Sequence, residues 1–104
     1  MWEEDDRSDD KEFERWAKAV KVRDNFTCAI CEKRGVYLES HHLNSWDWCV
    51  DDRYSIDNGV TLCIFHHQRF HEAFGYGNNY DWQYKQYKKA YDVLKKVANN
   101  KIGS

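Results

Sequence analysis

The chain has 104 residues, which is enough for one small domain. Its formal net charge of −2 is unevenly distributed, because residues 1–12 carry a net charge of −5 and residues 13–104 a net charge of +3. No stretch approaches the roughly 18 apolar residues that a membrane-spanning helix needs, and the acidic N-terminus has no signal-peptide core. We therefore expect a cytoplasmic protein without membrane contacts, whose weakly basic body would bind a polyanion modestly and in a salt-sensitive way.

The first half of the chain is expected to hold one helix and one strand. Residues 1–9 are predicted to be a disordered acidic tail, and apolar residues at helical spacing predict a helix over 10–24. A tight knuckle at 28–31 precedes a strand over 36–43, in which neighbouring side chains alternate between two faces. Residues 44–57 show no clear period, and a loop of this length in a small domain is usually functional or anchored.

The second half is expected to complete a hairpin and to add two helices. Asn58-Gly59 indicates a turn before a short strand over 60–62. A helix over 64–74 is expected to end at Gly75, and a final helix is expected over 81–98. Its predicted apolar side consists of Trp82, Tyr84, Tyr87, Tyr91, Leu94 and Val97. These elements predict an α+β fold with a strand–loop–strand–helix core and flanking N- and C-terminal helices, in a single domain over 10–99.

Two chelating pairs predict a structural zinc ion. Cys28-x-x-Cys31 and Cys63-x-x-His66 are separated by 31 residues, and zinc prefers four tetrahedral nitrogen and sulfur ligands. A lone Cys-x-x-Cys would also suit a redox pair, but the second pair favours zinc held by all four residues. Cys49 has no near partner in the sequence and is interpreted as a loop or core thiol.

The remaining histidines predict a second metal site. His67 and His71 are four residues apart in a predicted helix, so both project from one face and can hold one ion. His41 and His42 point to opposite sides of an extended strand, so one can bind that ion while the other acts as a general base. The competing interpretations are that these are ordinary surface histidines, or that all five histidines serve zinc.

The two interlocking patterns resemble the HNH endonuclease family. The string from Asn58 to His71, Asn-Gly-Val-Thr-Leu-Cys-Ile-Phe-His-His-Gln-Arg-Phe-His, is similar to the second half of that motif. Residues 19–28 are similar to the helix that leads into zinc-containing members, and the spacing of the histidines resembles that of colicin-type nucleases. The segment 74–79 is similar to small phage-encoded members. The resemblance covers residues 13–80.

The resemblance implies a fold, a reaction and residue roles. The family has a ββα-metal (His-Me finger) core and hydrolyses DNA phosphodiester bonds to 5′-phosphate and 3′-hydroxyl ends with a divalent cation. By resemblance, His41, His67 and His71 hold this cation, which could be Mg²⁺, Mn²⁺, Ni²⁺ or Zn²⁺. His42 would be the general base, and Asn58 would orient it.

Two positions depart from the family pattern. Cys63-x-x-His66 replaces the second Cys-x-x-Cys of many members, and histidine remains a competent zinc ligand. His41 stands where many members have aspartate. Because imidazole favours softer ions than carboxylates do, this second departure leaves the metal preference open.

DNA is the expected partner. Arg53, Arg69 and the lysines of the last helix are candidates for phosphate contacts. The aromatic residues interpreted as core are Phe65, Phe70, Phe74 and Trp82. Trp46 and Trp48, in the long loop, are open to either a core or a base-stacking role.

The alternative function is a non-catalytic zinc-knuckle module that binds nucleic acid. Such a module would use Cys28, Cys31, Cys63 and His66 and would cut no DNA in any divalent cation. For a nuclease, a monomer would nick one strand, and double-strand cleavage would need a homodimer. Other phage proteins are further candidate partners, in the interior of the host cell if the chain is phage-encoded.

Overall fold

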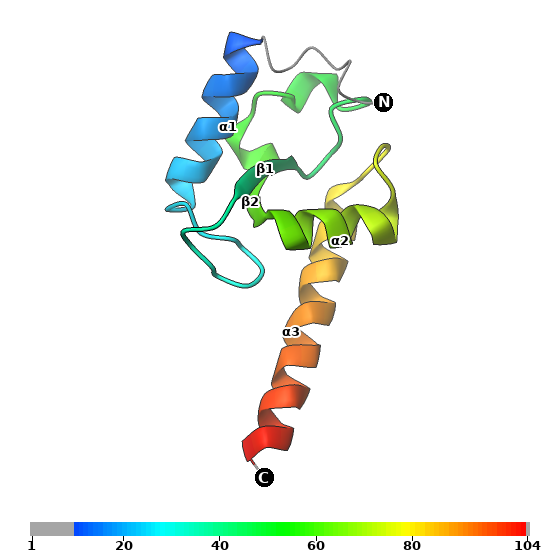
Figure 1. The fold of residues 1–104 in the computed structure, drawn as a ribbon. Coiled ribbons are helices and arrows are strands. Elements are labelled where there is room, and N and C mark those ends of the chain that lie inside the picture. Colours follow the sequence, from blue (N-terminus) through cyan, green and yellow to red (C-terminus); the bar gives the residue numbers. More distant parts are fainter. Residues whose placement is uncertain (1–9, 104) are drawn as a thin grey trace.

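The computed structural model describes residues 10–103, with side chains up to residue 98. The predicted acidic tail over 1–9 therefore lies outside the described residues. Within residues 10–103 we find no helix with the length and apolarity that crossing a membrane requires. The fold is α+β, with its elements in the order α1 (Lys11–Arg23), β1 (Leu38–His42), η3 (Val50–Asp52), η4 (Ile56–Asn58), β2 (Gly59–Cys63), α2 (Ile64–Phe74) and α3 (Asp81–Gly103) (Figure 1).

An antiparallel hairpin of β1 and β2 lies between two helices. Its register pairs Leu38 with Cys63 at one end and His42 with Gly59 at the other. The α1 side is marked by the Ser40 hydroxyl, which donates to the carbonyl of Ala17 at 2.6 Å. The α2 side is marked by His41, whose ring meets that of Phe70 edge-on. Because neighbouring residues of a strand point to opposite faces, α1 and α2 contact different side chains of β1.

Helix α1 begins where the sequence predicts it. The Asp10 carboxylate accepts hydrogen bonds from the backbone N–H groups of Glu12 and Phe13, which satisfies two donors of the first turn. The side chains that α1 buries are Trp16 and Val20. At the other end, the Asp24 carboxylate accepts from the backbone N–H of Thr61 at 3.0 Å. The helix is thereby joined to β2 through its C-terminal cap as well as through its apolar face.

Helix α2 follows its prediction at both ends, and α3 does not. Helix α2 ends at Gly75, which has a φ of +88° that glycine adopts without strain. Helix α3 extends to Gly103 instead of ending near residue 98. Its first half packs on the core through Tyr84, Tyr87 and Tyr91.

Part of the predicted core is exposed. Trp82, Leu94 and Val97 of α3 are each more than half exposed, so their assignment to a packed face was wrong. Figure 1 shows the reason for the last two, because the second half of α3 projects beyond the hairpin and α2. Phe65 is also more than half exposed, whereas Phe70 is fully buried in the core. Helical spacing identifies an apolar face but does not tell how much of it another element covers.

Gly59 is required by the contact between the hairpin and α1, in addition to any role in a turn. Its φ is −132°, which any residue adopts. A Cβ atom at this position would lie 2.6 Å from Cγ2 of Val20 and 2.7 Å from Cζ2 of Trp16. Both neighbours are buried side chains. The absence of a side chain at Gly59 therefore allows β2 to lie directly against α1.

We expect Gly59→Ala to destabilise the fold by about 1–3 kcal/mol, the usual cost of overpacking a core. Urea denaturation followed by circular dichroism measures this change. In a Val20→Ala background the penalty should be smaller, because one of the two clashing groups has been removed. Equal stability of Gly59→Ala and the unchanged chain would contradict the close approach of β2 and α1.

Candidate metal centres

Three cysteines gather at the end of the hairpin away from His42. The sulfur atoms of Cys28, Cys31 and Cys63 lie within 4.8 Å of one another. The Sγ atoms of Cys31 and Cys63 are 3.8 Å apart. A tetrahedral ion with metal–sulfur bonds of about 2.3 Å holds its sulfur ligands about 3.8 Å apart. These three residues are thus close enough to bind one metal ion.

The backbone holds the knuckle against β2. The N–H of Ala29 donates to the carbonyl of Thr61 at 2.9 Å, and the N–H of Glu32 donates to the carbonyl of Cys28 at the same distance. Glu32 adopts a φ of +65°, which closes the turn. This turn brings Cys28 and Cys31 to Cys63, the last residue of β2.

The environment of the thiols favours a cation. Burial alone would raise the pKa of the Cys28 thiol, but the backbone groups of Cys31, Cys63 and Ile30 outweigh burial and hold that pKa below its ordinary value. Burial, together with the neighbouring Cys28, raises the pKa of the Cys31 thiol to about 11. A second thiolate beside the first is therefore costly unless a cation is bound between them.

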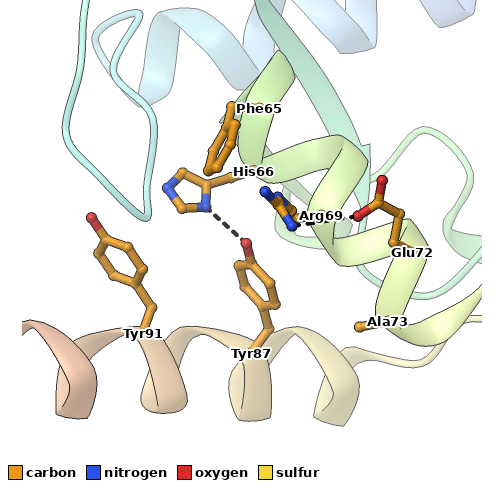
Figure 2. Close-up of a pocket in the computed structure, with 7 residues that line it drawn as sticks. All are labelled: Phe65, His66, Arg69, Glu72, Ala73, Tyr87 and Tyr91. Atoms are coloured by element: carbon orange, nitrogen blue, oxygen red, sulfur yellow. Dashed lines mark hydrogen bonds and ion pairs between the residues drawn. The ribbon is translucent and has the colours of Figure 1, made fainter.

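His66, the predicted fourth ligand, lies outside the group of three cysteines. It is buried in the first turn of α2, and its Nδ1 is hydrogen-bonded to the Tyr87 hydroxyl at 2.8 Å (Figure 2). Burial and the positive charges of Lys33 and Arg69 lower the pKa of the imidazole, which favours the neutral, ligating form. With Nδ1 engaged by Tyr87, Nε2 is the atom of His66 suited to a metal.

His66 forms one wall of a surface groove between α2 and α3. Figure 2 shows Tyr87 and Tyr91 of α3 facing this ring, with Phe65 beside it. Arg69 lies over the Phe65 ring at 4.9 Å and forms an exposed ion pair with Glu72. Arg69, which is a predicted phosphate-binding residue, thus lies on the groove side of α2.

Three histidines form a second group on the α2 side of β1. His41 of β1 and His67 and His71 of α2 place one ring nitrogen each within 4.8 Å of one another. The Nε2 atoms of His67 and His71 are 3.1 Å apart. Nitrogen ligands about 2.1 Å from one ion would be separated by about 3.0 Å in octahedral and about 3.4 Å in tetrahedral geometry. The observed separation suits a shared ion.

The tautomers of His67 and His71 point to the same conclusion. Nδ1 of His71 hydrogen-bonds to the carbonyl of Gly75 at 2.7 Å, and Nδ1 of His67 hydrogen-bonds to the carboxylate of Glu39. Carbonyl and carboxylate oxygens only accept, so each Nδ1 carries the hydrogen and each Nε2 carries a lone pair in the neutral ring. Two lone pairs that face each other repel, and a cation between them removes that repulsion.

His41 is the third member of the histidine group. Among the described residues it alone has a buried side-chain nitrogen, Nε2, without a hydrogen-bond partner, and the residue is 3% exposed. Burial, reinforced by the positive charge that His67, His71 and His42 can carry, holds the pKa of His41 well below its ordinary value. A buried neutral imidazole with an unpartnered nitrogen is the form that binds a metal.

His42 lies on the opposite face of β1, as strand alternation predicts. Its ring stacks on Trp16 with centroids 3.8 Å apart and planes 11° apart. Its Nε2 is hydrogen-bonded to the carbonyl of Arg53 at 2.7 Å. The carbonyl accepts, so Nε2 carries the hydrogen and Nδ1 the lone pair in the neutral ring. The ring is therefore held in one orientation and one tautomer.

Asn58 holds the long loop together. Its Oδ1 accepts from the backbone N–H of Asn44 at 2.9 Å, and its Nδ2 donates to the carbonyls of Asn44 and Asp52. Asn58 thus bridges backbone groups near the beginning and the middle of the loop. The Asp52 carbonyl precedes the Arg53 carbonyl that engages His42, so Asn58 fixes the segment to which His42 is bonded.

The sequence interpretation missed two supporting residues. Glu39 holds His67, and its position two residues before His41 on the same strand face was an available signal. Trp16 supports His42 from α1, and no local sequence pattern predicts a contact between residues so far apart in the chain. Cys49 is buried outside both groups, with Sγ 3.7 Å from Oδ2 of Asp52, as expected for a structural thiol.

Comparisons of this chain with family models, curated proteins and solved structures found no significant match.

The three cysteines predict a zinc-dependent fold. Cys28→Ser and Cys63→Ser should lose bound zinc and much of the folded structure, because the binding energy of a structural metal is part of the folding energy. Cys49→Ser, which changes a buried thiol outside the group, should retain about one zinc per chain. Elemental analysis with circular dichroism measures both properties. A purified chain that is folded and contains no metal would contradict the prediction.

The contact between Glu39 and His67 predicts a role in metal affinity. Glu39→Gln removes the negative charge that supports the imidazole, and should weaken divalent-cation binding about 10- to 100-fold. Calorimetric titration of Mn²⁺ or Ni²⁺ into the zinc-loaded protein measures the affinity. Glu72→Gln is the matched control, because it changes a carboxylate of α2 whose ion pair is with Arg69. Equal losses in both variants would show a general charge effect.

Proposed function

We propose that this protein is a metal-dependent DNA endonuclease of the HNH type, in which β1, β2 and α2 form a ββα-metal unit. The observation that carries the proposal is the pair of facing Nε2 atoms of His67 and His71, close to a ring nitrogen of His41, whose own Nε2 is buried without a hydrogen-bond partner. Such a set of three ring nitrogens, from one buried and two partly buried histidines, suits one divalent cation. The resemblance of the histidine and asparagine pattern to HNH endonucleases adds support from the sequence.

His41, His67 and His71 would hold the cation. When bound there, a divalent cation would stabilise negative charge on the phosphodiester and on its leaving oxygen. The protein would present these nitrogen donors on a rigid frame. Glu39 and the Gly75 carbonyl support His67 and His71, while burial keeps His41 deprotonated.

His42 would accept a proton from the attacking water. Its Nε2 is hydrogen-bonded to the carbonyl of Arg53 at 2.7 Å, which orients the ring, and an imidazole has a pKa suited to accepting a proton near neutral pH. Trp16 and the loop that Asn58 fixes keep the ring in place. His41 and His42 are adjacent in sequence, so a phosphodiester bound at this end of β1 would have the cation on one face of the strand and the base on the other. The products would have 5′-phosphate and 3′-hydroxyl ends.

A structural zinc at Cys28, Cys31, Cys63 and His66 would complete the assembly. The three cysteines are already grouped, and a movement of the His66 ring toward them would supply the fourth ligand. The zinc would join the knuckle to the junction between β2 and α2, next to the helix that carries His67 and His71. It would therefore stabilise the frame of the proposed nuclease.

Substitution of the two adjacent histidines separates their roles. His42→Ala should leave divalent-cation affinity nearly unchanged and lower plasmid nicking by roughly 100-fold or more, the usual effect of losing a general base. His41→Ala should weaken cation binding, so that excess cation partly restores nicking. Gln68→Ala, at an exposed position of α2, is the control. Nicking of supercoiled plasmid in Mg²⁺, Mn²⁺ and Ni²⁺, with calorimetry, measures both effects.

The outcomes discriminate between the functions. Loss of cation binding in His42→Ala and its retention in His41→Ala would mean that the two roles are exchanged. Full activity of both variants, or no cleavage by the unchanged chain in any of the three cations, would exclude the nuclease. The second outcome would favour the zinc-knuckle module that binds nucleic acid without cutting it.

A further inference from the structure

The turn after α2 places an exposed aromatic ring against a histidine of the second group. The Tyr76 ring lies nearly parallel to that of His71, with centroids 4.6 Å apart and planes 16° apart. One face of Tyr76 thus covers the histidine, yet 71% of the residue is exposed. A large ring that lies beside a candidate metal site and is open to solvent suggests a binding surface.

The position of Tyr76 is fixed from both sides of the turn. Before it, the Gly75 carbonyl accepts the hydrogen of His71 Nδ1 at 2.7 Å. After it, the N–H of Asn78 donates to the Asp47 carboxylate at 2.9 Å. Gly77, between these anchors, packs so closely that an added Cβ would lie 3.0 Å from the same carboxylate. The turn is therefore packed against the long loop and hydrogen-bonded to it.

The same turn and loop carry a second aromatic pair. Trp48 and Tyr80 stack with centroids 4.7 Å apart and planes 27° apart, and both are partly exposed. The indole N–H of Trp48 donates to the carbonyl of Asn79 at 2.7 Å, which fixes this pair to the turn. We refer to Tyr76, Trp48 and Tyr80 together as the aromatic platform. Tyr76 borders His71, while Trp48 and Tyr80 lie where the long loop is fixed to the same turn.

We infer that the aromatic platform binds unpaired bases of a single-stranded nucleic acid, with Tyr76 stacking on a base next to the phosphate at the histidine group. The inference rests on the proposed function for the phosphate, and it adds a substrate class: strands that are single or locally unpaired. Base faces are accessible to aromatic side chains only when the bases are unstacked from a duplex. Stacking of this kind tolerates any sequence.

Charge supports a base contact over a backbone contact at this surface. The carboxylate of Asp47 lies between the loop and the turn, where it accepts from Asn78. A phosphate at that position would meet a negative charge, whereas a base would not. Phosphate is therefore expected on the histidine side of Tyr76, where a cation would be held, and bases are expected on the aromatic side.

Binding of a fluorescein-labelled thymidine oligonucleotide, measured by anisotropy in the zinc-loaded protein without added divalent cation, tests the inference apart from cleavage. Tyr76→Ala should weaken single-strand binding at least about 5-fold and should leave binding of the matching duplex unchanged. Tyr76→Phe keeps the ring and should restore single-strand binding. Phe65→Ala, which removes an exposed ring on the groove side of α2, is the control.

Three results would overturn the inference: equal single-strand affinity of Tyr76→Ala and the unchanged chain, an equal loss in Phe65→Ala, or no single-strand binding at all. A loss of Mn²⁺ affinity in Tyr76→Ala, measured by calorimetry, would also overturn it, because Tyr76 would then support His71 only. Tyr76-dependent binding without any nicking would uphold the platform while excluding the nuclease. Nicking of duplex DNA at an equal rate by Tyr76→Ala and the unchanged chain would support the nuclease and exclude the platform.

Discussion

The two faces of the β1–β2 hairpin carry different chemistry because neighbouring side chains of a strand point in opposite directions. His41 and His42 are one residue apart, yet His41 meets the histidines of α2 and His42 meets Trp16 of α1. Each face therefore needs its own helix, and the close approach of α1 at Gly59 is part of this arrangement. A shift of one residue in the register would exchange the two histidines and remove both sets of contacts.

The cysteine group and the histidine group are connected through α2. Cys63 ends β2 and immediately precedes α2, so the knuckle of Cys28 and Cys31 is anchored where the strand joins the helix. His67 and His71 project from that same helix. A small domain buries a limited apolar surface, and here the residues that would bind a structural ion also set the start of the helix that carries the second group.

The histidines on the two faces of β1 are surrounded by side chains and carbonyls that select their tautomer or protonation state. Glu39 and the Gly75 carbonyl select the tautomers of His67 and His71, and the Arg53 carbonyl selects that of His42. Burial lowers the pKa of His41 and so keeps the ring neutral. These supports are spread over β1, the long loop and the turn after α2. The long loop thus contributes to both faces, through Arg53 on one side and through Asp47 on the other.

The sequence alone determined the local elements and the identity of the candidate ligands. The cap at Asp10, the end of α2 at Gly75, the chelating spacing of Cys28 and Cys31 and the four-residue spacing of His67 and His71 all arise from interactions within a few residues, which a sequence pattern records. The tertiary structure decided what depends on contacts between distant segments. Among these are the exposure of Trp82, Leu94 and Val97, the separation of His66 from the cysteine group, and the support of His42 by Trp16. Helical or strand periodicity gives the direction of a side chain, but packing in three dimensions determines what it meets there.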